Sequence, residues 1–170
     1  MKLIVGIFLY SAIAIDHTLL TALNAIAAKQ ATATKQTEDI CHRVLDYIAI
    51  QPNVSLVFQK SDMVLTIDLD ADYLVEPQSR IRFAGYFQLN SNKKSSNFVN
   101  GEILIECKTL RHVVASSVEE ETAGKFHNSQ VPIQLIYILN QMGHPQPATL
   151  LKTYNAAVNL FVHDNITQKK

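Results

Sequence analysis

The spacing of apolar residues changes twice along this chain of 170 residues, and that change constrains its fold more than any other feature. Up to Ile50, apolar side chains recur at the three- and four-residue spacing of amphipathic helices. Between residues 54 and 108 they alternate with polar ones, as in β-strands, and after Leu110 helical spacing returns. This order predicts an α/β fold in which helices pack on a mixed sheet, preceded by a small helical segment.

The residues that end each periodic stretch set the expected boundaries. The expected helices cover residues 17–28, 37–50, 115–128 and 131–142, with a last helix beginning at residue 156. The expected strands cover residues 54–59, 63–69, 80–89, 98–108 and 148–153. Pro52 ends the second helix, while Pro132 and Gly143 begin and end the fourth. We therefore expect a helical segment over 1–50 and a sheet-containing domain over 51–170.

Residues 1–15 allow two interpretations. Lys2, the apolar run over 3–10 and the small residues Ala12 and Ala14 are typical of a signal peptide with its cleavage site. The run is too short for a membrane-spanning helix. Alternatively, the segment is a buried helix of a larger fold, followed by Asp16 as the cap of the next helix.

Charge and cysteine content limit the classes of function. The chain has 15 Lys+Arg and 15 Asp+Glu, which argues against a free-standing, strongly basic nucleic-acid-binding protein but not against one part of a larger machine. Its apolar content of 48% is too high for a disordered chain. Cys41 and Cys107 lack the spacing of a zinc site, and we expect buried thiols.

Acidic residues gather at two places, and each allows a structural and a functional interpretation. Asp68, Asp70 and Asp72 alternate with apolar residues, so an extended strand would direct all three carboxylates to one face. The glutamates at 119–121 lie early in the helix over 115–128, where acidic groups also stabilise the helix dipole. Carboxylates from separate elements bind Mg²⁺, but a solvated surface explains the same charges. The spacing leaves both interpretations open.

The helix over 115–128 is expected to turn one apolar stripe towards the sheet. That stripe consists of Ala115, Val118, Thr122 and Phe126. On this expectation Glu120 points farthest from the sheet, while Glu119 and Glu121 flank the stripe.

Several segments occur in the order of one known polyprotein. They are 61–65 (SDMVL), 69–74 (LDADYL), 84–87 (AGYF) and 113–121 (VVASSVEEE). They resemble copia-type retrotransposon polyprotein, in which the reverse transcriptase continues directly into a ribonuclease H domain. Residues 2–10 and 14–16 resemble the end of the reverse-transcriptase region, and 143–149 resemble the segment before the late strand. The resemblance covers nearly the whole chain.

The resemblance implies a fold and an activity. The fold is ribonuclease H-like and truncated at its C-terminus, and the activity is cleavage of the RNA strand in an RNA–DNA hybrid by two Mg²⁺ ions. Asp70 matches the family's first catalytic aspartate and Glu121 matches its helix glutamate, so these two are the implied metal ligands. The implied partners are the hybrid and the upstream reverse-transcriptase domain, and the implied location is inside the cell.

The chain departs from the family's pattern where the third carboxylate is expected. Tyr154 stands at that position, and a neutral phenol is a poor Mg²⁺ ligand at neutral pH. The fourth aspartate would lie after residue 170. With two of four ligands left, we expect the domain to be inactive.

Two alternatives from other classes stay open. One is a small secreted protein without catalytic function, whose signal peptide is residues 1–15. The other is an inactive domain that still binds a nucleic acid, with phosphate contacts from Arg80, Arg82, Lys93 and Lys94. A solvated loop would explain the same basic residues.

Overall fold

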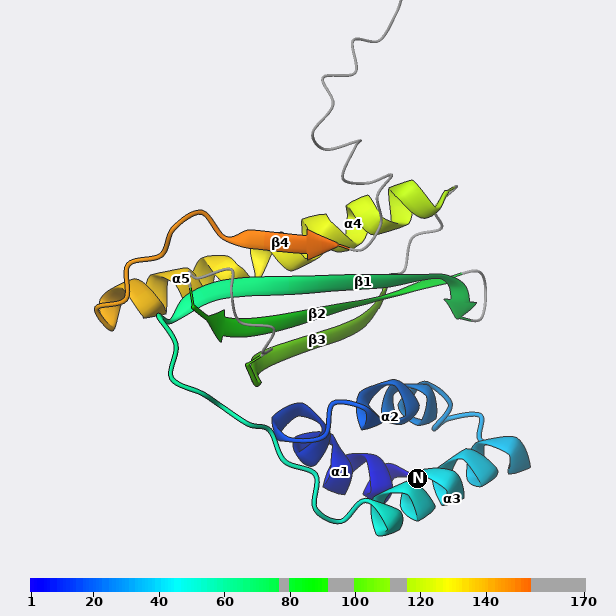
Figure 1. Cartoon of the computed structure of the whole chain (residues 1–170). Helices are drawn as coiled ribbons and strands as arrows, with labels where there is room; N and C mark the ends of the chain where they lie inside the picture. Colours follow the sequence, from blue (N-terminus) through cyan, green and yellow to red (C-terminus); the bar gives the residue numbers. More distant parts are fainter. Residues whose placement is uncertain (77–79, 92–99, 111–115, 154–170) are drawn as a thin grey trace, which may run out of the picture. The chain divides into compact units, whose positions relative to one another are not determined.

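The computed structural model of the chain describes residues 1–76, 80–91, 100–110 and 116–153 (Figure 1). The chain divides into two compact units, Met1–Val57 and Phe58–Lys170. The sequence placed this boundary after residue 50, where the third helix ends.

The first unit consists of three helices, α1 (Lys2–Ala14), α2 (Leu19–Ala28) and α3 (Lys35–Ile50). α1 and α3 both pack against α2. The expected helices over 17–28 and 37–50 are confirmed with shifts of two residues at their starts. No helix within the described ranges has the length and apolar content needed to cross a membrane.

A side-chain cap is present at the start of α3 but not at the starts of α1 and α2. The Asp16 carboxylate accepts a hydrogen bond from the backbone N–H of Thr18 at 3.2 Å in the turn before α2, whereas the N-cap residue of α2 is Thr18, so the expected cap at Asp16 is two residues too early. At the start of α3, Thr34 and Thr37 form a reciprocal capping box, in which each hydroxyl accepts from the other's backbone N–H.

The second unit contains a four-stranded mixed sheet. Its strands are β1 (Val64–Glu76), β2 (Arg80–Asn90), β3 (Glu102–Leu110) and β4 (Leu150–Thr153), in the order β3-β2-β1-β4. β1, β2 and β3 are antiparallel neighbours, and β4 runs parallel to β1. A parallel neighbour requires a crossover, which α4 (Ser117–Gln130) and α5 (Pro132–Gln141) supply. The predicted mixed sheet with helices is therefore confirmed at the level of the α/β class.

The predicted strand over 54–59 is wrong, because residues 54–63 are irregular. The side chain of Asn100 forms hydrogen bonds with backbone groups that would otherwise pair with a neighbouring strand. It accepts a hydrogen bond from the N–H of Gln59 at 2.8 Å and donates to the carbonyl oxygens of Gln59 and Leu89 at 3.2 and 2.7 Å. The expected helix from residue 156 lies outside the described residues.

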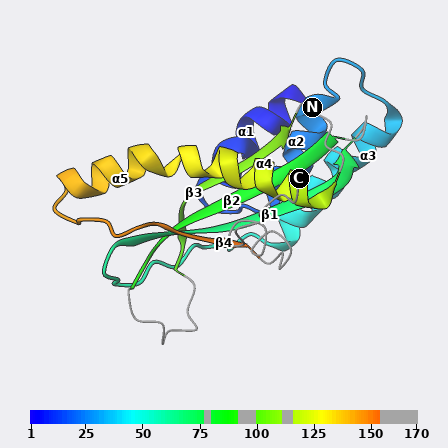
Figure 2. The ribbon, with the colours of Figure 1, turned by 90° about the horizontal axis from the view of Figure 1, so that it is seen from above.

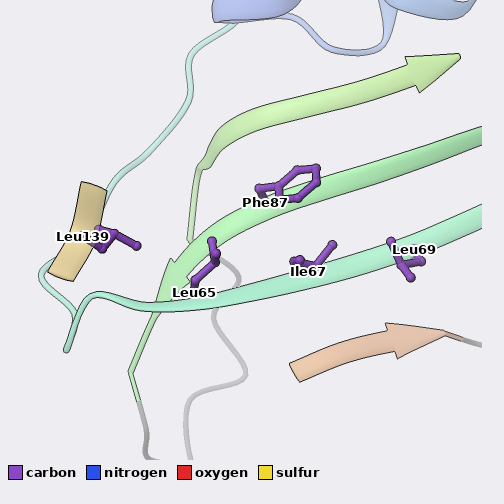
Figure 3. Packing of buried hydrophobic residues seen from close by; sticks show 5 residues of the cluster. All are labelled: Leu65, Ile67, Leu69, Phe87 and Leu139. Atoms are coloured by element: carbon purple, nitrogen blue, oxygen red, sulfur yellow. The ribbon is translucent and has the colours of Figure 1, made fainter. Parts of the chain in front are cut away.

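The core of the second unit lies between one face of the sheet and the two helices (Figures 2 and 3). Leu65, Ile67 and Leu69 alternate along β1 and point to this face, together with Phe87 of β2. Leu139 of α5 packs against them. The opposite face of β1 therefore carries the intervening residues, among them Asp68 and Asp70.

α4 approaches the sheet through polar and small residues, so its predicted apolar stripe is wrong. Glu120 and Asn128 are each 1% exposed, whereas Phe126 is 62% exposed. The reason is a close approach at Gly85 of β2, where an added Cβ atom would lie 2.4 Å from the Asn128 Oδ1 atom. Asn128 also donates to the carbonyl oxygen of Ala84 at 3.4 Å. The absence of a side chain at Gly85 makes room for this contact. Glu120 and Asn128 are two helical turns apart, so they lie on the same side of α4.

Candidate functional site

Asp70 lies near the middle of β1 on the face that turns away from α4 and α5. Its neighbour Leu69 is 4% exposed and belongs to the core, so strand alternation directs Asp70 to the other side. Asp70 is exposed on that side, and its backbone is paired with Ala84 of the neighbouring strand β2. The backbone of Asp72 continues the same strand opposite Arg82.

Asp68 shares this face and has a cationic partner. The ammonium group of Lys152 on β4 lies 3.4 Å from its Oδ1 atom. The pairing follows from the parallel register, in which Asp68 and Lys152 are direct neighbours. The sequence singled out Asp68 but not Lys152, because only the register of the sheet brings them together.

Glu121 lies on α4, on the opposite side of the sheet from Asp70. The hydroxyl of Thr153 donates a hydrogen bond to its Oε2 atom at 3.0 Å. Thr153 is the last residue of β4 and is paired with Leu69 of β1. The side chain of Glu121 is therefore directed towards the end of β4, a contact that sequence reasoning did not find.

Lys125 follows Glu121 by one helical turn on α4. Partial burial lowers the pKa of its ammonium group, because desolvation disfavours the charged form, and the nearby Glu121 carboxylate raises that pKa in part. Glu121 thus has a hydroxyl donor on one strand and a cation on its own helix. Neither neighbour was identified from the sequence.

The two expected metal ligands do not converge. Asp70 and Glu121 come from the two different faces of the sheet, and Glu121 already accepts from Thr153. Among the described residues there is no group of three or more His, Cys, Asp or Glu side chains arranged to hold a metal ion. Tyr154 lies outside the described residues. The donor set that is described does not fit a pair of Mg²⁺ ions, which needs several carboxylates around one point.

The expected phosphate contacts are only partly described. Arg82 is 8% exposed, so its guanidinium presents little surface to a bound nucleic acid. Arg80 begins β2, and its backbone is paired with Glu76. Lys93 and Lys94 lie outside the described residues. Of the four expected phosphate contacts, Arg82 is therefore the one whose side chain the structure describes.

Comparison of the chain with models of protein families, with curated proteins and with solved structures gave no match.

Proposed function

We propose that this chain derives from a copia-type retrotransposon polyprotein. It comprises the end of the reverse-transcriptase region, residues 1–50, and a ribonuclease H-like domain, residues 51–170, that has lost its activity. The basis is the resemblance of the motif segments and their order along the chain. The mixed sheet of the second unit, with its helical crossover between β3 and β4, is compatible with this origin.

One observation carries the proposal beyond the sequence pattern. Residues of the two segments that match catalytic motifs meet at the end of β4, next to the position where the third carboxylate is expected, although they are far apart along the chain. Leu69, which precedes the matched Asp70, is the register partner of Thr153, and Thr153 in turn donates to the matched Glu121. A common location for these segments is what an inherited active site would leave after its ligands were lost.

The loss of activity has two physical reasons. Tyr154 replaces a carboxylate, and a phenol with a pKa of about 10 stays neutral and binds Mg²⁺ poorly. In addition, the carboxylates of Asp70 and Glu121 are directed to different faces of the sheet. Two-metal hydrolysis depends on metal ions held between the attacking water and the leaving oxygen, and this arrangement offers no such clamp.

The inactivity is tested with a labelled RNA strand in an RNA–DNA hybrid, incubated with the purified chain in Mg²⁺ or Mn²⁺. We expect no cleavage products above those of a reaction without protein. Tyr154→Asp alone is not expected to produce cleavage, because it does not bring Asp70 and Glu121 together. Cleavage that is lost in Asp70→Asn but kept in the control Asp39→Asn, a change in the first unit, would overturn the proposal.

The origin is tested separately by the DNA on either side of the coding sequence. We expect reverse-transcriptase motifs in the DNA upstream of the part that encodes residues 1–50. Flanking DNA without any polymerase-like sequence would contradict the proposed origin whatever the result of the cleavage assay.

A further inference from the structure

The helical unit contains an open pocket of about 340 Å³ between the start of α2 and the middle of α3. Its apolar lining is formed by Leu19, Ala22, Ile40 and Val44. Leu19 and Val44 are 4% and 5% exposed, so the floor of the pocket is part of the core of this unit. A volume of this size lies within the range of small-molecule sites, which are mostly apolar with few polar groups.

Two hydroxyl groups at the rim are already engaged within the protein. Thr18 donates its hydroxyl proton to the buried Asp16 carboxylate at 2.5 Å. Its oxygen lies 3.0 Å from the hydroxyl of Tyr47, so Tyr47 is the donor in that second bond. Since both protons are used in this chain of hydrogen bonds, neither hydroxyl is left to donate to a ligand.

Arg43 is the remaining polar group at the pocket. Its side chain is exposed and forms no ion pair with another described residue, although Asp39 and Asp46 lie within one helical turn. The described lining of the pocket includes no acidic side chain. A guanidinium with free donors beside an apolar floor is complementary to a carboxylate that bears a hydrocarbon tail.

We propose that this pocket binds an aliphatic monocarboxylate of medium chain length. The alkyl chain lies on the floor formed around Leu19 and Val44, and the carboxylate accepts hydrogen bonds from Arg43. This inference rests on the first unit alone, and it does not depend on the proposed retrotransposon origin.

The first test titrates the full chain calorimetrically with hexanoate, octanoate and decanoate below their micelle-forming concentrations. Each added methylene should lower the dissociation constant about twofold to fourfold until the pocket is filled. 1-Octanol, which has the same tail but no charge, should bind about tenfold more weakly than octanoate. No measurable binding, or affinity that is independent of chain length, would overturn the proposal.

Variants of the pocket test separately the binding of the carboxylate by Arg43 and the binding of the alkyl chain by the apolar floor. Arg43→Gln should weaken octanoate about tenfold and leave 1-octanol unchanged, because it removes only the charge. Ala22→Phe should weaken both ligands by filling the pocket. Lys35→Gln, which removes a charge from α3 outside the lining, is the matched control and should change neither affinity.

Octanoate binding that survives both Arg43→Gln and Ala22→Phe would show that the fatty acid binds elsewhere, and it would overturn the proposed site. Circular dichroism of each variant confirms that its helices are retained. Arg43 has an exposed side chain, so its replacement keeps the test decisive even where Ala22→Phe alters the fold.

Discussion

At the scale of single residues, the contact between α4 and the sheet depends on one missing side chain. Gly85 lies beneath Asn128, and the two residues leave no space for a Cβ atom. Asn128 is almost completely buried, and its Oδ1 atom has no hydrogen-bond partner among the described residues. The inner surface of α4 is therefore polar, and the helix packs closely against the sheet there without burying a large apolar side chain.

Gly85→Ala should destabilise the protein by about 1–3 kcal/mol, the usual cost of overpacking. The added methyl group would lie 2.4 Å from Asn128 Oδ1 and 2.8 Å from its Cγ atom. Urea denaturation measures the change. Gly6→Ala is the control, because nothing lies within 4 Å of an added Cβ there and alanine favours the helix. The loss should shrink when Asn128→Ala is already present, and an equal loss in that background would contradict the proposed clash.

A second prediction at this scale concerns the charge pair on α4. The pKa of Lys125 is lowered by burial and partly raised by Glu121. Glu121→Gln removes the favourable carboxylate, so it should lower the pKa of Lys125 further. Titration of the lysine ε-carbon by NMR measures this directly. Glu119→Gln is the matched control and should leave that pKa nearly unchanged, and an upward shift in Glu121→Gln would contradict the assignment.

The lowered pKa also sets the sign of the pH dependence. Lys125 loses its proton in the folded state at a lower pH than in the unfolded state. Between those two values the unfolded chain binds more protons, so the contribution of this group to stability rises with pH through that window.

At the scale of elements, the alternating pattern predicted two strands before residue 70, and only the one with neighbouring strands formed. Residues 63–69 form the start of β1 because β2 and β4 flank them. Residues 54–59 alternate in the same way, but Val57 and Phe58 are more than half exposed and the segment forms no ladder. Pairing is a tertiary property, so the sequence pattern by itself could not separate the two.

The irregular segment before β1 should depend on Asn100. Asn100→Ala removes three hydrogen bonds to backbone groups of Gln59 and Leu89, and the buried side chain is only 7% exposed. We expect a loss of about 1–3 kcal/mol, because backbone polar groups lose their partners. Hydrogen exchange at the amide of Gln59 should accelerate as well. Asn53→Ala, which changes an exposed residue just before this segment, should have little effect, and unchanged exchange in Asn100→Ala would contradict this role.

At the scale of the whole molecule, the spacing of apolar residues and the positions of proline and glycine were enough to predict the types of most elements. They predicted helices α2, α3, α4 and α5, the mixed character of the sheet, and the alternation of Asp68 and Asp70 with core residues. These features depend on residues that are close together along the chain, so the spacing of apolar residues is enough to predict them. The acidic positions were therefore visible before any fold was known.

Only the tertiary structure decided what these positions face. Strand register paired Asp68 with Lys152, and the close approach at Gly85 chose the inner face of α4 and buried Glu120. The same packing turned Glu121 towards Thr153 and away from the face that carries Asp70. Such contacts join residues far apart in the chain, and their geometry depends on how closely helices and strands approach. The sequence by itself determined which groups the protein carries, and packing decided which of them meet.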